Sequence, residues 1–138
     1  MNGAGVFVSP STPLSFLAFD FGTRRVGVAT GNTLTRNPQP LRTVAAEGEA
    51  RFAAIGKLIA EWQPDALVVG VPFHPDGAAH DNTRRAKRFV RQLEGRFHLP
   101  VHEVDERYST ASASAAGARD LDAASAAIIL EQYLGGLA

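Results

Sequence analysis

The sequence predicts one α/β domain built on a mixed five-stranded sheet with helices on its faces. Two apolar runs, residues 14–21 and 25–31, are separated by a short glycine-containing turn, which is typical of an antiparallel hairpin. Further along the chain, helix-like and strand-like segments alternate, as they do where crossover helices join parallel strands. The length of 138 residues is enough for a single domain with its own hydrophobic core. We expect this domain to occupy residues 14–138 and the Gly-, Ser- and Pro-rich residues 1–13 to form a disordered tail.

The individual elements follow from local patterns. A third strand is expected after the proline-containing break at 37–40, and Phe52, Ile55 and Leu58 recur at helical spacing. The β-branched run at 66–71 is typical of a strand buried on both faces. The expected order is strands at 14–21, 25–31 and 41–44, a helix at 49–62, a strand at 66–71, a helix at 81–97, a strand at 101–106, a short helix at 109–117 and a last helix from 122 to 135. A three-strand meander followed by this alternation is the arrangement of the ribonuclease H-like fold.

Composition narrows the class of protein. The chain has no cysteine, which excludes disulfides, thiolate zinc sites and a cysteine nucleophile. Fourteen basic and fourteen acidic residues cancel, so the net charge gives no sign of a polyanionic partner. The first thirteen residues carry no Lys or Arg, and no apolar run approaches the roughly 20 residues of a membrane span. We therefore expect a cytoplasmic protein that does not contact membranes.

Acidic residues gather where the predicted strands and helices end. Asp20 closes an otherwise apolar strand, Asp105 and Glu106 close the last strand, and Asp122 begins the last helix with Asp120 just before it. A carboxylate at the end of a core strand is costly without a compensating partner, and several carboxylates at one sheet edge repel one another. A divalent cation such as Mg²⁺ or Mn²⁺ would compensate them and could support phosphodiester hydrolysis.

Each acid also has a simpler explanation. Asp122 could cap the last helix, and Asp105 or Glu106 could form a surface ion pair with Arg107. Asp20 is the hardest to explain in this way because the rest of its strand is apolar. Taken one at a time, only Asp20 favours a functional role.

The predicted helix at 81–97 carries six of the fourteen basic residues of the chain. Apolar residues at core spacing leave its other face strongly positive, and such a stripe suits a phosphate backbone. The alternative is an ordinary solvated helix face. The residues that we expect to bind nucleic acid are Arg84, Arg85, Lys87, Arg88 and Arg91.

Four segments in order resemble a known family. They are residues 18–29 (AFDFGTRRVGVA), 69–72 with 76–77, 105–110 (DERYST) and 122–134. Together they resemble the YqgF/RuvX family of pre-16S rRNA nucleases, also called Holliday junction resolvases, over about residues 16–134. The resemblance implies a ribonuclease H-like fold and metal-dependent cleavage of nucleic acid. It also implies that Asp20, Glu106 and Asp122 are catalytic and bind Mg²⁺ or Mn²⁺, with Asp105 as a rival to Glu106.

Two positions depart from the family pattern. The family commonly has Asn where His74 stands, and it has a longer, Gly- and Lys-containing connection before the closing helix than residues 117–121 provide. Such a connection could contact substrate. Its shortening therefore bears on substrate handling and on activity.

Several functions compete at this point. The leading hypothesis is a nuclease acting on structured RNA at the 5′ end of pre-16S rRNA, and a branched-DNA resolvase is second. A phosphate-binding hairpin of the actin and Hsp70 type would also contain the Asp-Phe-Gly-Thr sequence at 20–23, but those proteins need two such domains. A non-catalytic nucleic-acid-binding or ribosome-assembly factor is the last alternative. The sequence is compatible with a monomer or a weak dimer.

Overall fold

The computed structural model describes residues 13–72, 80–106 and 120–137. The predicted short helix at 109–117 and residues 1–12 of the predicted tail lie outside them. The elements are β1 (Ser15–Phe21), β2 (Val26–Asn32), β3 (Gln39–Val44), α1 (Gly48–Trp62), β4 (Ala66–Pro72), α2 (His80–Phe97), β5 (Val101–Glu106) and α4 (Leu121–Gly135). Every strand and long helix predicted for the described residues is present, with ends that differ by one or two residues. None of these helices is long and apolar enough to cross a membrane.

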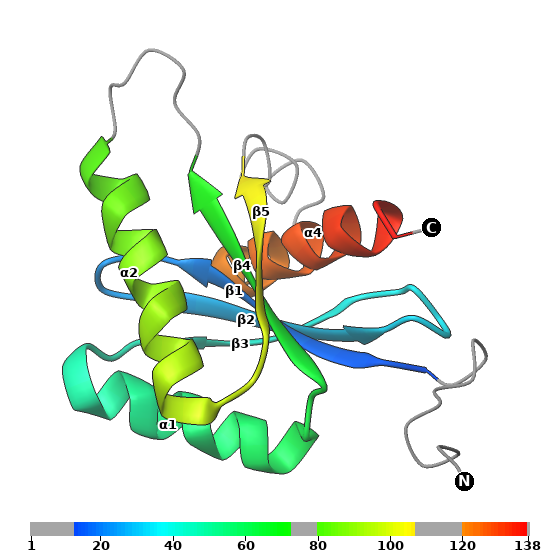
Figure 1. Ribbon diagram of the computed structural model, residues 1–138, viewed down its shortest axis with the longest axis horizontal. Coiled ribbons are helices and arrows are strands. Elements are labelled where there is room, and N and C mark those ends of the chain that lie inside the picture. Colours follow the sequence, from blue (N-terminus) through cyan, green and yellow to red (C-terminus); the bar gives the residue numbers. More distant parts are fainter. Residues whose placement is uncertain (1–12, 73–79, 107–119, 138) are drawn as a thin grey trace, which may run out of the picture.

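The five strands form one mixed sheet in the order β3-β2-β1-β4-β5, which is visible in Figure 1. β1 pairs antiparallel with β2 and parallel with β4, so the first strand is central as predicted. β3 begins at Gln39, inside the predicted break, and includes Pro40. A proline is tolerated there because β3 is an edge strand, where one backbone N–H need not join the ladder.

The two faces of the sheet are covered by different helices (Figure 1). Leu17 and Phe19 of β1 belong to the larger core cluster, which they form with residues of α1 and α2. The alternate residues Phe16 and Ala18 belong to a second cluster with α4 on the other face. This alternation follows from the two-residue period of a strand and fixes the face on which each later residue of β1 lies.

Small residues bring α4 close to the sheet. A Cβ atom added at Gly27 of β2 would lie 1.8 Å from the backbone oxygen of Asp122, and one at Gly31 would lie 2.9 Å from Leu130 Cδ2. Gly27 is therefore required by the approach of the helix backbone, whereas a methyl group at Gly31 would require the Leu130 side chain to shift. The first turn of α4 consequently rests directly on β2.

Candidate functional site

Asp20 lies near the end of the central strand, on the face covered by α4. Phe16 and Ala18 pack in the α4 cluster, and strand alternation places Asp20 on the same side. Its register partners are Gly27 on β2 and Gly70 on β4. Both partners are glycines, and the Asp20 side chain is partly buried.

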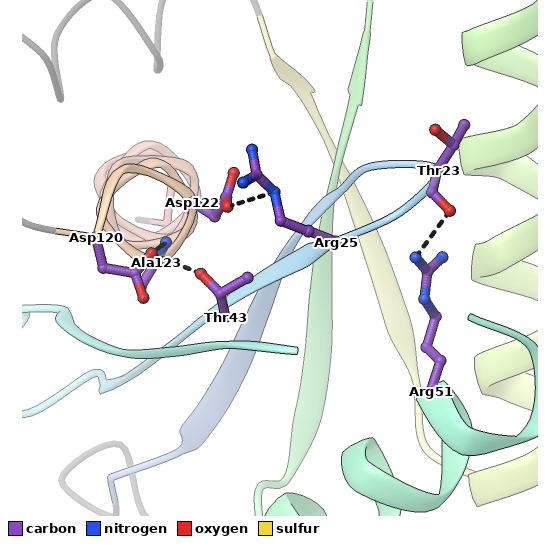
Figure 2. A network of polar contacts seen from close by, with 7 residues as sticks. All are labelled: Thr23, Arg25, Thr43, Arg51, Asp120, Asp122 and Ala123. Atoms are coloured by element: carbon purple, nitrogen blue, oxygen red, sulfur yellow. Dashed lines mark hydrogen bonds and ion pairs between the residues drawn. The ribbon is translucent and has the colours of Figure 1, made fainter. Parts of the chain in front are cut away.

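Asp122 is the second residue of α4 and does not cap the helix. The cap is Asp120, whose carboxylate accepts a hydrogen bond of 3.0 Å from the Ala123 N–H and one of 2.6 Å from the Thr43 hydroxyl. The alternative that Asp122 is a helix cap is therefore wrong. Its carboxylate instead forms an ion pair with Arg25, with Nε and Oδ2 3.2 Å apart, as Figure 2 shows.

The cap at Asp120 also explains a shifted pKa. Partial burial alone would raise the pKa of this carboxyl, but the hydrogen bond from Thr43, the N–H groups of Ala123 and Asp122 and the charge of Arg25 together lower it. Asp120 is thus held as a carboxylate that fixes the start of α4 against β3. This anchoring places the next acid, Asp122, at the rim of the sheet, by which we mean the end where β1 stops and β2 begins.

Gly27 brings two predicted site residues together. It is the register partner of Asp20, and the Asp122 backbone oxygen occupies the space where its Cβ would stand. Asp20 and Asp122 are 102 positions apart in the sequence. Both lie directly beside Gly27, on the same face of the sheet.

The register of β5 separates Asp105 from Glu106. Asp105 pairs with Val71, which belongs to the core on the α1 and α2 face, and it lines a hollow there with Thr83 and Lys87. Glu106 pairs with Pro72 and lies two positions beyond Val104, which packs in the α4 cluster. The backbone register therefore assigns position 106 to the face of Asp20. The Glu106 side chain lies outside the described part of the structure, and the described side chains alone include no group of three acids or histidines that could hold a metal.

The turn between β1 and β2 is fixed by a buried arginine that sequence analysis missed. Arg51 of α1 is 6% exposed and donates to the backbone oxygens of Thr23, at 3.0 Å, and of Ala46, at 2.8 Å. Its guanidinium also lies over the Phe21 ring, 5.6 Å from the centroid. Figure 2 shows this side chain reaching the turn from below, while Arg25 extends from the same hairpin toward α4. The helical pattern of α1 gave no signal for this contact because a lone arginine in a helix is usually exposed.

The basic residues of α2 fall into two groups. Arg84 pairs with Asp81, Lys87 pairs with Glu103 at 2.9 Å, and Arg96 pairs with Glu49. The other three are exposed and have no acidic partner within the described residues. They are Arg85, Arg88 and Arg91.

The N-terminal end of α2 lies at the same sheet edge as the acids. The Thr83 hydroxyl donates to the Pro72 backbone oxygen at 2.9 Å, at the end of β4. Asn82 lines a small hollow together with Gly22 and Thr23 of the β1–β2 turn. The basic helix therefore starts beside the hairpin that carries Asp20 and Arg25. His74 and residues 117–119 lie outside the described residues.

Comparison with known proteins identifies the family. The family model described as "RuvX: Holliday junction resolvase" matches residues 14–136. The chain belongs to the RuvX family. Two similar relatives, each with the name "Putative pre-16S rRNA nuclease", come from Polaromonas sp. (68% identical over 123 residues, 89% of this chain and of the relative) and Albidiferax ferrireducens (67% over 120 residues, 87% of this chain and 77% of the relative). The family predicted from the four sequence segments is confirmed.

Solved structures support the fold. RuvC of T. thermophilus, in complex with a Holliday junction substrate, superposes with a TM-score of 0.59 at 15% identity, covering 88% of this chain and 94% of that one. A second T. thermophilus RuvC structure gives a TM-score of 0.53 at 14% identity. The predicted ribonuclease H-like fold is confirmed for this RuvX chain.

Proposed function

We propose that this chain is a metal-dependent nuclease that hydrolyses phosphodiester bonds at the 5′ end of pre-16S rRNA. The observation that carries the proposal is the meeting of Asp20 and Asp122 around Gly27, on the face to which the β5 register assigns position 106. The RuvX family match and the names of relatives 54–68% identical to this chain support a nuclease. Its substrate belongs to the cytoplasm, where we therefore place the protein.

The donor set at this rim fits a divalent cation. Asp20 and Asp122 offer carboxylate oxygens on one face, and the register of β5 assigns position 106, a third acid, to the same face. Oxygen ligands of this kind suit Mg²⁺ or Mn²⁺. Neighbouring carboxylates repel one another unless a positive charge lies between or beside them. In the structure Arg25 places such a charge beside Asp122.

The chemistry divides between the acids and the basic residues. Asp20, Glu106 and Asp122 would hold a divalent cation, which would supply Lewis-acid stabilisation of the phosphate and would lower the pKa of an attacking water. The exposed arginines of α2 bind the phosphate backbone and position the strand, which requires no sequence readout. Arg51 and the tight turn at Gly22, where a Cβ would lie 2.5 Å from the Arg25 backbone oxygen, keep the hairpin in place.

Branched DNA is the second candidate substrate. The family description names a Holliday junction resolvase, and the fold is that of RuvC. A likeness at 15% identity carries the fold alone, whereas relatives up to 68% identical are named for pre-16S rRNA. We therefore favour RNA and treat junction DNA as the competitor in every assay.

The site is tested by a matched pair of variants at adjacent positions. Glu106→Gln, like Asp20→Asn and Asp122→Asn, should reduce Mg²⁺-dependent cleavage of a precursor-rRNA fragment on the order of a hundredfold or more, because a metal ligand is lost. Asp105→Asn should cleave at close to the wild-type rate, because Asp105 lies on the opposite face of the sheet. Equal losses in Glu106→Gln and Asp105→Asn would overturn this assignment.

Parallel assays decide the substrate. Wild-type protein is incubated with precursor rRNA and with a four-way DNA junction, each with Mg²⁺, with Mn²⁺ and with EDTA. Faster cleavage of the RNA in metal supports the proposal, and faster cleavage of the junction reverses the order of the two substrates. Tight RNA binding without cleavage in the presence of either metal would identify a non-catalytic assembly factor and would overturn the proposal of nuclease activity.

A further inference from the structure

Arg25 makes an ion pair with a carboxylate that the proposed reaction also uses. Its side chain is 65% exposed, and its Nε lies 3.2 Å from Asp122 Oδ2. An arginine carries five N–H donors, so one guanidinium can donate to a second acceptor besides a carboxylate. Asp122 is also a proposed metal ligand, and a divalent cation beside its carboxylate would repel the guanidinium.

The surroundings of Arg25 give its side chain room to move. One hollow is lined by Gly22, Thr23, Arg24, Arg25 and Asp122. A second, on the side of α4, is lined by Arg25, Thr43, Asp120, Leu121 and Asp122. Arg25 and Asp122 therefore stand between two open hollows at the rim of the sheet, where a nucleic-acid strand could approach either side.

The ion pair is not needed to hold the hairpin. Arg51 already fixes the turn through the Thr23 backbone oxygen, and β1 and β2 are paired along their whole length. Exposed ion pairs also contribute little to stability. A purely structural role therefore does not explain why the positive charge of Arg25 lies against Asp122.

We propose that Arg25 is a phosphate-binding residue of the nuclease site, held by Asp122 in the metal-free protein and transferred to a substrate phosphate when a divalent cation binds Asp122. The inference rests on the proposed function, because it requires Asp122 to bind the cation. Arginine suits this exchange because its planar guanidinium pairs with both carboxylates and phosphates. No covalent bond changes: one ionic contact replaces another.

The exchange predicts opposite effects on metal and on nucleic acid. In Arg25→Gln the cation no longer competes with a guanidinium, so Mn²⁺ should bind the free protein about two- to fivefold more tightly, the range expected for one exposed ion pair. Isothermal calorimetry with Mn²⁺ measures this directly. Arg24→Gln is the matched control, because Arg24 is exposed, lines the same hollow and has no ion pair within the described residues. Its Mn²⁺ affinity should change less than that of Arg25→Gln, and Arg25→Lys should resemble wild type.

RNA binding provides the second measurement. With a labelled RNA hairpin, the slope of log K against log salt should fall by about one in Arg25→Gln when Ca²⁺ is present, because one phosphate contact is lost. In EDTA the same substitution should change the slope less, because Asp122 then holds Arg25. Arg24→Gln should change the slope by the same amount in both conditions. An equal effect of Arg25→Gln in Ca²⁺ and EDTA would contradict the exchange.

The calorimetry separates failure of the inference from failure of the proposed function. If wild-type protein binds Mn²⁺, Asp122→Asn loses that binding and Arg25→Gln binds Mn²⁺ no more tightly than wild type, only the exchange is wrong. If Asp122→Asn keeps the wild-type Mn²⁺ affinity, or if wild type binds no Mn²⁺, the proposed metal site is wrong and the exchange falls with it. Should Arg25→Gln not fold, Arg25→Met is tested in its place for the same tighter binding.

Discussion

The two faces of the central sheet are packed by different means. On the α1 and α2 face, Phe19 and Phe89 are fully buried and in ring contact, with centroids 6.0 Å apart. On the α4 face, Ala18 and Gly27 allow a helix backbone to touch the strand. Large side chains keep a helix at a distance and supply stability, whereas small ones let the helix carry a carboxylate to the rim. The difference explains how Asp122 of α4 comes close to the strand that carries Asp20.

The aromatic face should account for the largest share of stability. Phe89 also contacts Phe21 and Phe52, with centroid distances of 5.1 and 6.0 Å. Phe89→Ala should lower the free energy of unfolding by about 3–5 kcal/mol, because it removes a buried ring and leaves a cavity. Urea denaturation measures the loss. Mn²⁺ affinity of the folded protein should be unchanged, and a large loss of that affinity would mean that the two faces are not separate in function.

Disturbing the close contact on the α4 face should lower the free energy of unfolding less than Phe89→Ala does, but it should impair the proposed metal site more. Gly27→Ala should destabilise the protein by about 1–3 kcal/mol, because the new methyl group collides with the Asp122 backbone oxygen. It should also weaken Mn²⁺ binding, because Asp122 must shift. Gly95→Ala is the control: it lies in α2 with nothing within 4 Å of an added Cβ, and it should stabilise by about 0.5–1 kcal/mol. A stabilised Gly27→Ala variant would contradict the close contact.

The same contrast shows what the sequence could reveal. Apolar runs predicted β1 and β4 because both faces of these strands are buried in the core, and Asp20 could be detected as a charge within such a run. The role of Gly27 could not be predicted, because a glycine within a strand does not indicate which distant element packs against it. The choice between Asp105 and Glu106 likewise depends on a parallel register set by β4, which local pattern does not contain.

Two further features depended on tertiary contacts. Asp120 and Asp122 are both acceptable helix caps by residue type, and the Thr43 hydroxyl on β3 is what engages Asp120 in the structure. The basic stripe of α2 was visible as a pattern, but its division into paired and exposed residues depends on Glu103 of β5 and Glu49 of α1.

The cap of α4 gives a smaller, pH-dependent effect. Asp120→Ala should cost about 1 kcal/mol at pH 7, the usual value for a lost N-cap. The folded pKa of Asp120 is lowered, so its carboxylate stabilises the fold fully above the ordinary value of about 3.9, and this stabilisation is lost as the pH falls through the lower folded value. Unfolding measured from pH 7 downward should therefore show the difference between variant and wild type shrinking only below about pH 4. A difference that is constant down to that range and beyond would contradict the cap's charge dependence.

The smallest expected effect on stability lies on α2. Arg88→Gln should leave unfolding nearly unchanged, within about 0.5 kcal/mol, because Arg88 is exposed and has no acidic partner among the described residues. It should lower the salt slope of RNA binding by about one. Lys87→Gln is the matched control, because Glu103 already pairs with Lys87, and its slope should change less. Equal slope changes in the two variants would show that it does not matter for RNA binding whether a basic residue of α2 is paired with an acid.

Anomalous diffraction from a crystal soaked in Mn²⁺ locates the metal directly. We expect a Mn²⁺ peak on the α4 face, bounded by the carboxylates of Asp20, Asp122 and Glu106, with the Arg25 guanidinium moved away from Asp122. A peak on the α2 side at Asp105, or an Asp122 that keeps Arg25 while Mn²⁺ binds elsewhere, would contradict it.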